Sequence, residues 1–175
     1  MGLLEQQNFL ARIFTDENIR RRFWQDPEKV GQENDLVADE IAELKQIVRV
    51  ELDFFADSLV HKRLHEVEKL LPLTSNALET NFSRLFSEFS QTFQPQGVKK
   101  HLEDAIEFCR FVRRNEDLSE LARETAKFEQ TRHEFFSQHR TIAFCLLKAN
   151  LFGSQRKYGV AVWYRIGRRI RHFIL

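Results

Sequence analysis

The segment VELDFFADSLVHKRLHEVEKLL, residues 50–71, decides the fold class of this 175-residue chain. Its apolar residues recur at every third or fourth position, which is the spacing of one face of an α-helix. They are Leu52, Phe55, Ala56, Leu59, Val60, Leu64, Val67 and Leu71. Pro72 follows, where a helix is expected to stop. An apolar stripe of this length needs covering elements, so we expect other helices to pack around it.

The same spacing continues on both sides of this segment. Residues 76–93 carry a stripe rich in phenylalanine, made of Leu78, Phe82, Leu85, Phe86, Phe89 and Phe93. Asn76 followed three residues later by Glu79 is a capping signal for the start of that helix. Further helices are expected within residues 3–14, 17–25, 27–34, 39–47, 98–114 and 118–136, the stripe of 98–114 starting at Val98. We therefore predict a mainly α fold, a single-domain bundle of about seven or eight helices spanning residues 1–175.

The pattern changes after His139. The runs TIAFCLLKANL (141–151) and KYGVAVWYRI (157–166) are rich in β-branched and aromatic residues, and FGSQR between them has turn chemistry. They predict a small β-hairpin near the C-terminus, followed by a brief basic end. A helix is the alternative from Trp163 onward, because Ile166, Ile170, Phe173 and Ile174 would share one side of it. Strand and helix both stay open for residues 158–175.

Charge divides the chain into two parts. Residues 135–175 contain no carboxylate side chain and eight basic ones. The other 19 basic residues face all 26 acidic residues, so residues 1–134 carry a net charge of −7. We distinguish an acidic helical body, residues 1–137, from a basic C-terminal segment, residues 138–175. This asymmetry indicates either an anionic partner for the basic segment or docking of that segment on the acidic body.

The sequence contains no motif for catalysis. Its six glycines are isolated, so there is no phosphate-binding loop, and no G-x-S-x-G nucleophile motif occurs. Cys109 and Cys145 lie in apolar stretches, where burial raises the pKa of a thiol and lowers its reactivity. One helix face carries four potential metal ligands, Asp57, His61, His65 and Glu68. The Glu-x-x-His pairs of a di-iron bundle are absent, so a solvated face is the favoured interpretation. We expect a protein without enzymatic activity, metal or cofactor.

Compartment follows from the same observations. Two thiols without a secretory charge pattern at the N-terminus favour a reducing cytosol. The apolar stretches without charge are too short to span a bilayer. We expect a cytoplasmic protein without a transmembrane segment.

The segment RIGRRIRHFIL, residues 165–175, gives the strongest functional lead. Arginine favours bidentate recognition of carboxylate or phosphate groups. The candidate partner-binding residues are Lys157, Trp163, Arg165, Arg168, Arg169 and Arg171. We expect them to contact a protein or peptide partner of acidic character. The alternative, less favoured, is that the same arginines bind nucleic acid or an anionic membrane surface.

Four stretches occur in order along the chain: LARIFTDENIRRRFWQDPEKVG (10–31), FADSLVHKRLHEVEKLLPLTSNAL (55–78), KKHLEDAIEFCRFV (99–112) and VAVWYRIGRRIRH (160–172). Together they resemble a bacterial α-helical domain family that occurs alone or C-terminal to multinuclear non-haem iron-dependent oxidase-type enzymes. Those oxidases modify ribosomally made peptides, commonly with a separate partner that recognises the peptide. The resemblance implies a non-enzymatic accessory or peptide-recognition module. It implies no iron site here, because the chain has neither an oxidase barrel nor clustered iron ligands.

Overall fold

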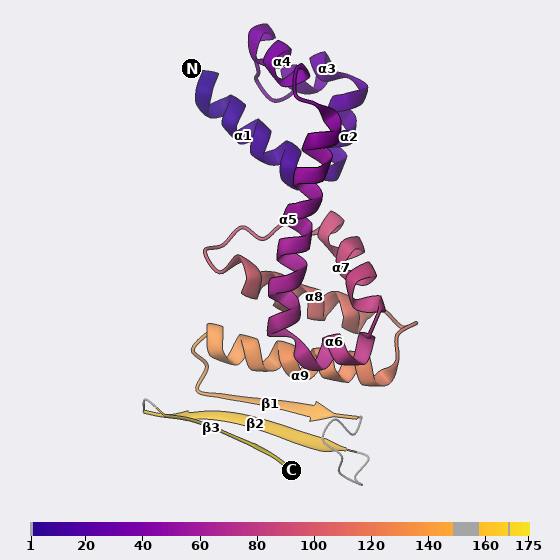
Figure 1. Ribbon diagram of the computed structural model, residues 1–175. Coiled ribbons are helices and arrows are strands. Elements are labelled where there is room, and N and C mark those ends of the chain that lie inside the picture. Colours follow the sequence, from indigo (N-terminus) through magenta and orange to yellow (C-terminus); the bar gives the residue numbers. More distant parts are fainter. Residues whose placement is uncertain (1, 149–157, 168) are drawn as a thin grey trace. The chain divides into compact units, whose positions relative to one another are not determined.

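The computed structural model describes residues 2–148, 158–167 and 169–175, and within them it is mainly helical with a small antiparallel sheet near the C-terminus (Figure 1). The fold class predicted from the sequence is confirmed. The helices are α1 (Gly2–Thr15), α2 (Glu17–Gln25), α3 (Pro27–Gln32), α4 (Ala38–Lys45), α5 (Arg49–Leu70), α6 (Pro72–Leu78), α7 (Asn81–Thr92), α8 (Lys100–Arg114) and α9 (Glu120–Ser137). The strands are β1 (Ile142–Leu147), β2 (Gly159–Ile166) and β3 (Arg169–Ile174).

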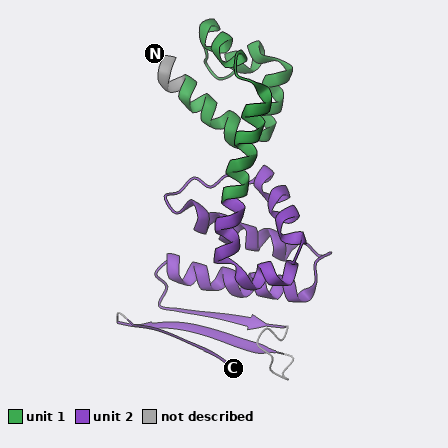
Figure 2. Ribbon diagram, viewed as in Figure 1, with its two compact units in different colours: residues 1–62 green, residues 63–175 purple. Residues whose placement is uncertain are grey.

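The chain forms two compact units, residues 1–62 and residues 63–175 (Figure 2). The boundary between them falls within α5. One helix therefore contributes residues to both units. The single-domain organisation expected from the sequence stays a prediction.

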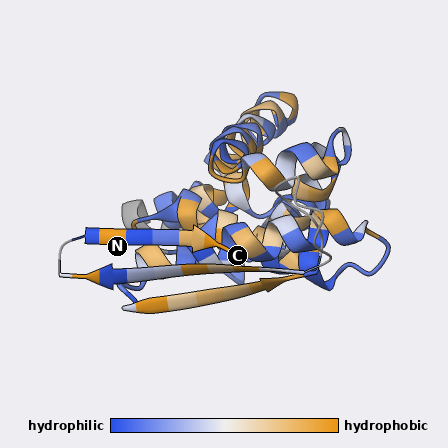
Figure 3. Ribbon diagram, turned by 90° about the horizontal axis from the view of Figure 1, so that it is seen from below, coloured by the Kyte–Doolittle hydropathy of each residue, from blue (hydrophilic) through white to orange (hydrophobic). Residues whose placement is uncertain are grey.

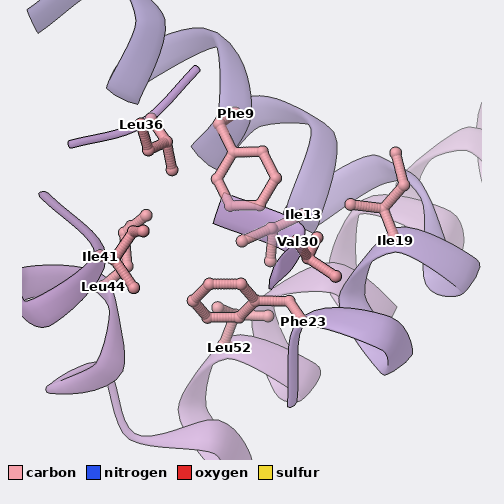
Figure 4. Close-up of a cluster of buried hydrophobic side chains, with 9 residues drawn as sticks. All are labelled: Phe9, Ile13, Ile19, Phe23, Val30, Leu36, Ile41, Leu44 and Leu52. Atoms are coloured by element: carbon pink, nitrogen blue, oxygen red, sulfur yellow. The ribbon is translucent and has the colours of Figure 1, made fainter. Parts of the chain in front are cut away.

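The first unit is built around nine buried apolar side chains (Figure 4). They are Phe9, Ile13, Ile19, Phe23, Val30, Leu36, Ile41, Leu44 and Leu52, contributed by α1 to α5 and the α3–α4 connection. The first backbone N–H groups of a helix have no partner within the helix, and two aspartates accept hydrogen bonds from such groups in α2 and α3. The Asp16 carboxylate accepts a hydrogen bond from the N–H of Ile19 (3.0 Å), and Asp26 accepts one from the N–H of Lys29 (3.1 Å).

The second unit has an aromatic core between α7 and α8. Phe82, Phe86 and Phe89 are at most 3% exposed, as their stripe predicts, while Phe93 is half-buried. Their rings surround Phe108 of α8 at centroid distances of 5.2 to 5.5 Å, mostly in tilted or edge-to-face arrangements. Such aromatic pairs stabilise a core beyond the area that they bury.

A buried ion pair connects this core to α5. Arg63 Nη2 lies 2.7 Å from an oxygen of Asp104, a residue with no exposed surface, and also donates to the carbonyl of Phe93. The guanidinium lies 5.9 Å from the centroid of the Phe86 ring. Because both charges are compensated at short range, the pair can be tolerated inside the unit.

The helix predicted over residues 76–93 is wrong in its boundaries. The structure has two helices there, α6 from Pro72 to Leu78 and α7 from Asn81 onward. Glu79 separates them with a φ of +50°, so it ends α6 instead of serving in a cap with Asn76. Pro72 both ends α5 and begins α6, because proline is well suited to the first position of a helix. Val98 is also fully exposed, since α8 begins two residues later than predicted.

The C-terminal part forms strands, which excludes the helical alternative for residues 158–166 and 169–174. β1 pairs with β2, and β2 pairs with β3, all antiparallel. The expected hairpin is therefore confirmed, while β3 replaces the brief basic end. Gly167, with a φ of +58°, lies at the turn into β3, in a conformation that glycine adopts readily.

The sheet packs on α9 through its inner face. The buried cluster there contains Phe128 and Phe135 of α9, with Ala143, Cys145, Leu147, Ala161 and Trp163 of the sheet. The alternating burial along β1 follows from the two-residue period of a strand. This cluster holds one face of the sheet against α9.

Candidate partner-binding surface

The sheet has a second face, called here the outer face, that is turned away from α9. Residues directly opposite each other in antiparallel strands have side chains on the same face, so the register assigns each residue to a face. The outer face consists of Ile142, Phe144 and Leu146 of β1, Val160, Val162, Tyr164 and Ile166 of β2, and Arg169, Arg171 and Phe173 of β3. Figure 3 views the sheet from this side, with the three strands in front of the helices of the second unit.

The outer face is apolar and exposed. Ile142, Phe144 and Leu146 are 53%, 67% and 55% exposed, and Ile166 of the neighbouring strand is 68% exposed. Folded proteins expose many single apolar residues, but contiguous apolar patches mark interaction sites. The outer face is thus a candidate interaction surface on geometry alone.

Two of the sequence-predicted arginines border this apolar area. Arg169 lies opposite Ile166, Arg171 lies opposite Tyr164, and both arginine side chains are exposed. Neither forms an ion pair within the described residues, and the three strands contain no carboxylate. The face therefore combines apolar side chains with uncompensated positive charge along β3, an arrangement complementary to an acidic, partly apolar partner.

The structure places two other predicted site residues on the inner face. Trp163 is 3% exposed and packs on Phe128, with ring centroids 5.1 Å apart. Arg165 is half-buried, with its guanidinium 5.8 Å from the centroid of the Phe135 ring. Its Nε is buried without a hydrogen-bond partner in the part of the chain that is described. Both side chains support the sheet, and they are not brought together with Arg169 and Arg171.

The remaining two predicted residues, Lys157 and Arg168, lie outside the described residues. Sequence reasoning missed the apolar side chains of β1. All six residues of IAFCLL are apolar, so the run has no alternation that would separate a buried face from an exposed one. The absence of alternation was itself a usable signal. A strand that is apolar on both faces is expected to be covered on both faces, and α9 covers only one.

Polar contacts from α9 hold β1 in place. Glu124, which is 8% exposed, accepts a hydrogen bond from the N–H of Lys148 at 2.8 Å, directly after β1 ends. The ammonium of Lys127 donates to the carbonyl of Leu146. One contact is to a backbone group of β1 and the other is to the residue that follows it, so together they hold the end of β1 against α9. The outer face is therefore presented by a supported sheet.

The potential metal ligands on α5 and the two cysteines do not form a site within the described residues. The four potential ligands on α5 are all exposed, and no group of three or more His, Cys, Asp or Glu within the described residues could hold a metal ion. Cys109 and Cys145 are buried, and burial raises the pKa of each thiol, well above its ordinary value at Cys109. A thiol in this state is a poor nucleophile at neutral pH.

An open cavity of about 360 Å³ lies between the ends of α7 and α8. Its walls include Phe89, Phe93 and Phe111, with Glu107 and Arg114 among the polar groups around it. Glu107 forms an ion pair with Arg110. The cavity therefore offers one carboxylate, and that carboxylate is already paired.

No described helix is both long enough and apolar enough to cross a membrane. Comparison of the chain with models of protein families, with curated proteins and with solved structures finds no match in any of the three. The resemblance to the bacterial helical domain family therefore stays a prediction.

Proposed function

We propose that the protein is a non-enzymatic binding or accessory module, which recognises a protein or peptide partner of acidic character through the C-terminal sheet. One observation carries this proposal: the outer face joins exposed apolar side chains on β1 and β2 to Arg169 and Arg171, which form no ion pair within the described residues. Apolar contact supplies affinity, while charge complementarity selects the partner and speeds association.

The contacts of the arginines in the sheet do not favour the alternative, in which the basic segment docks on the acidic body of the same chain. If the basic segment were spent on the acidic body, its arginines would be expected to pair with carboxylates there. In the described residues, Arg140 at the start of the segment does lie 3.9 Å from Glu134 of the body. The arginines of the sheet do not follow it: Arg165 packs on an aromatic ring, and Arg169 and Arg171 have no ion pair. The resemblance noted above adds that the partner is a peptide or protein connected with a peptide-modifying enzyme.

Site-specific photo-crosslinking in the cells that make the protein tests this function. A photoreactive phenylalanine analogue at Phe144 probes the outer face. The same analogue at Phe54 of α5, where the side chain is 76% exposed, is the matched control. We expect one identifiable protein or peptide product from position 144 that is absent from position 54. The product should disappear when Arg169 and Arg171 are both replaced by glutamate. Equal products from both positions would contradict the proposal.

The second candidate function is binding of nucleic acid or of an anionic membrane surface. The observation that favours it is the exposure of Arg169 and Arg171 beside apolar side chains. For duplex DNA, each neutralised phosphate contributes about −0.9 to the slope of log K against log salt. Replacing both arginines by alanine would then flatten the slope by about two. Binding at physiological salt with this behaviour would favour the second function over the first.

A further inference from the structure

The outer edge of β3 offers backbone groups for another strand. Val160 and Leu175 exchange both of their backbone hydrogen bonds, at 3.1 and 2.9 Å. In an antiparallel pair such hydrogen-bonded positions alternate with non-bonded ones. Residues 169, 171 and 173 therefore direct their N–H and C=O groups toward β2, and residues 170, 172 and 174 direct theirs toward the outer edge. No described strand pairs with that edge.

The side chains along this edge alternate in chemistry as well. On the outer face the order is Arg169, Arg171 and Phe173. On the inner face the order is Ile170, His172 and Ile174, and Ile170 packs against the buried cluster under the sheet. A strand added here would meet two positive charges at alternate positions on one face and apolar groups on the other.

From this alternation we propose that the outer edge of β3 accepts an extended peptide segment, antiparallel to β3, with acidic residues at two alternate positions. The inference rests on the proposed function and names the chemistry of its partner. Read from the N-terminus of the partner, the residues opposite 174 to 169 are apolar, apolar, unrestricted, Asp or Glu, apolar, and Asp or Glu. The two carboxylates lie at non-hydrogen-bonded positions, where side chains of neighbouring strands are closest.

Other occupants fit this edge less well. An edge that alternates donors and acceptors is complementary to a peptide backbone, whereas phosphodiesters and lipid phosphates only accept hydrogen bonds. A second copy of β3 would bring no carboxylate to the arginines, because residues 135–175 contain none. The sheet is antiparallel throughout, and antiparallel pairing is the more stable arrangement for a short strand.

Fluorescence polarisation with synthetic peptides tests the inference. The probe is a labelled peptide with the core Val-Val-Thr-Glu-Val-Glu. Its matched control, Val-Val-Thr-Val-Glu-Glu, has the same composition, but adjacent residues of a strand point to opposite faces. Only one glutamate of the control can therefore meet an arginine in any register. We expect the full-length protein to bind the probe at least tenfold more tightly than the control. Equal binding of the two would overturn the inference.

Backbone methylation separates strand pairing from simple charge attraction. A methyl group on the amide nitrogen of the valine opposite Ile170 removes a hydrogen bond to β3, and should weaken binding at least tenfold. The same change at the glutamate opposite Arg171 affects an N–H that points away from β3, and should change binding less than threefold. Equal sensitivity at the two positions would show that the peptide does not add as a strand.

Charge reversal in the protein completes the test. The variant with Arg169→Glu and Arg171→Glu should lose binding of the probe at least tenfold and gain binding of a peptide with lysines in place of both glutamates. A control with Arg21→Glu and Arg114→Glu, which are exposed on α2 and α8, should bind the probe like the original protein. If all peptides fail while crosslinking at Phe144 still identifies an arginine-dependent partner, the strand-addition inference is wrong and the proposed function stands.

Discussion

Phe86 is the residue whose packing we expect to matter most for stability. It has no exposed surface, its ring lies 5.3 Å from that of Phe108 and 5.7 Å from that of Phe89, and the Arg63 guanidinium lies above it. Phe86→Ala should lower the free energy of unfolding by about 3–5 kcal/mol, because it removes buried surface and leaves a cavity. Urea denaturation measures the loss. Phe54→Ala, at an exposed position, should change it by less than about 0.5 kcal/mol, and a similar loss in both variants would contradict this prediction.

Glu129 gives a prediction about pH at the same scale. Its carboxylate is fully buried and accepts hydrogen bonds from the N–H groups of Leu73 and Thr74, both at 2.9 Å, and from the Thr74 hydroxyl at 2.7 Å. These donors lower the pKa, but burial outweighs them and raises it above the ordinary value of 4.5. The Glu129 carboxyl group therefore binds a proton more tightly in the folded state than in the unfolded state.

The sign of the effect follows from that difference. The stability that Glu129 contributes through this proton is complete below pH 4.5 and is lost as the pH rises through its folded pKa. Glu129→Gln does not titrate. The free energy of unfolding of the original protein, minus that of the variant, should therefore fall as the pH rises above 4.5. Chemical denaturation at several pH values measures it. A difference that instead grows with pH would mean that the three hydrogen bonds outweigh burial.

At the scale of elements, the break between α6 and α7 was not predictable from the pattern. Leu78, Phe82 and Leu85 are all buried and keep helical spacing straight through the break. The residue that makes the turn is a glutamate, which carries no turn signal, and not a glycine or proline. A tertiary contact positions the other end of this helix, where Glu129 of α9 accepts hydrogen bonds from the first N–H groups of α6.

Glu79 should be strained in this turn. Its φ of +50° with a ψ of −126° is a backbone conformation that only glycine adopts without cost. Glu79→Gly should raise the free energy of unfolding by about 1 kcal/mol, since relief of strain exceeds the entropic cost of glycine. Glu79→Ala keeps the strain and should differ from the original protein by less than about 0.5 kcal/mol. Thermal melting of both variants checks this, and an alanine variant more stable than the glycine variant would contradict it.

At the scale of the whole molecule, β3 can be removed to separate a docking role from a structural one. Of its residues, only Ile170 packs against the buried cluster, while Arg169 and residues 171–174 are exposed. Deletion of residues 167–175 should therefore leave the protein folded, with a melting temperature within about 5 °C of the original, a shift that corresponds to roughly 2 kcal/mol for a chain of this length. The truncated protein should no longer bind the acidic peptide. A sharply lowered melting temperature would assign β3 to the structure instead.

The helical fold class, most helix positions, the C-terminal hairpin and the concentration of basic residues beside it could all be predicted from the sequence. These features depend on the spacing and composition of residues that are close together in the sequence. Which side of each strand is covered could not be predicted in this way and is known from the packing of the sheet on α9. This packing buried Trp163, laid Arg165 on Phe135, and left Phe144, Arg169 and Arg171 exposed on the outer face. The physical reason is that burial of a strand face depends on what packs against it, here α9, which is far from β3 in the sequence.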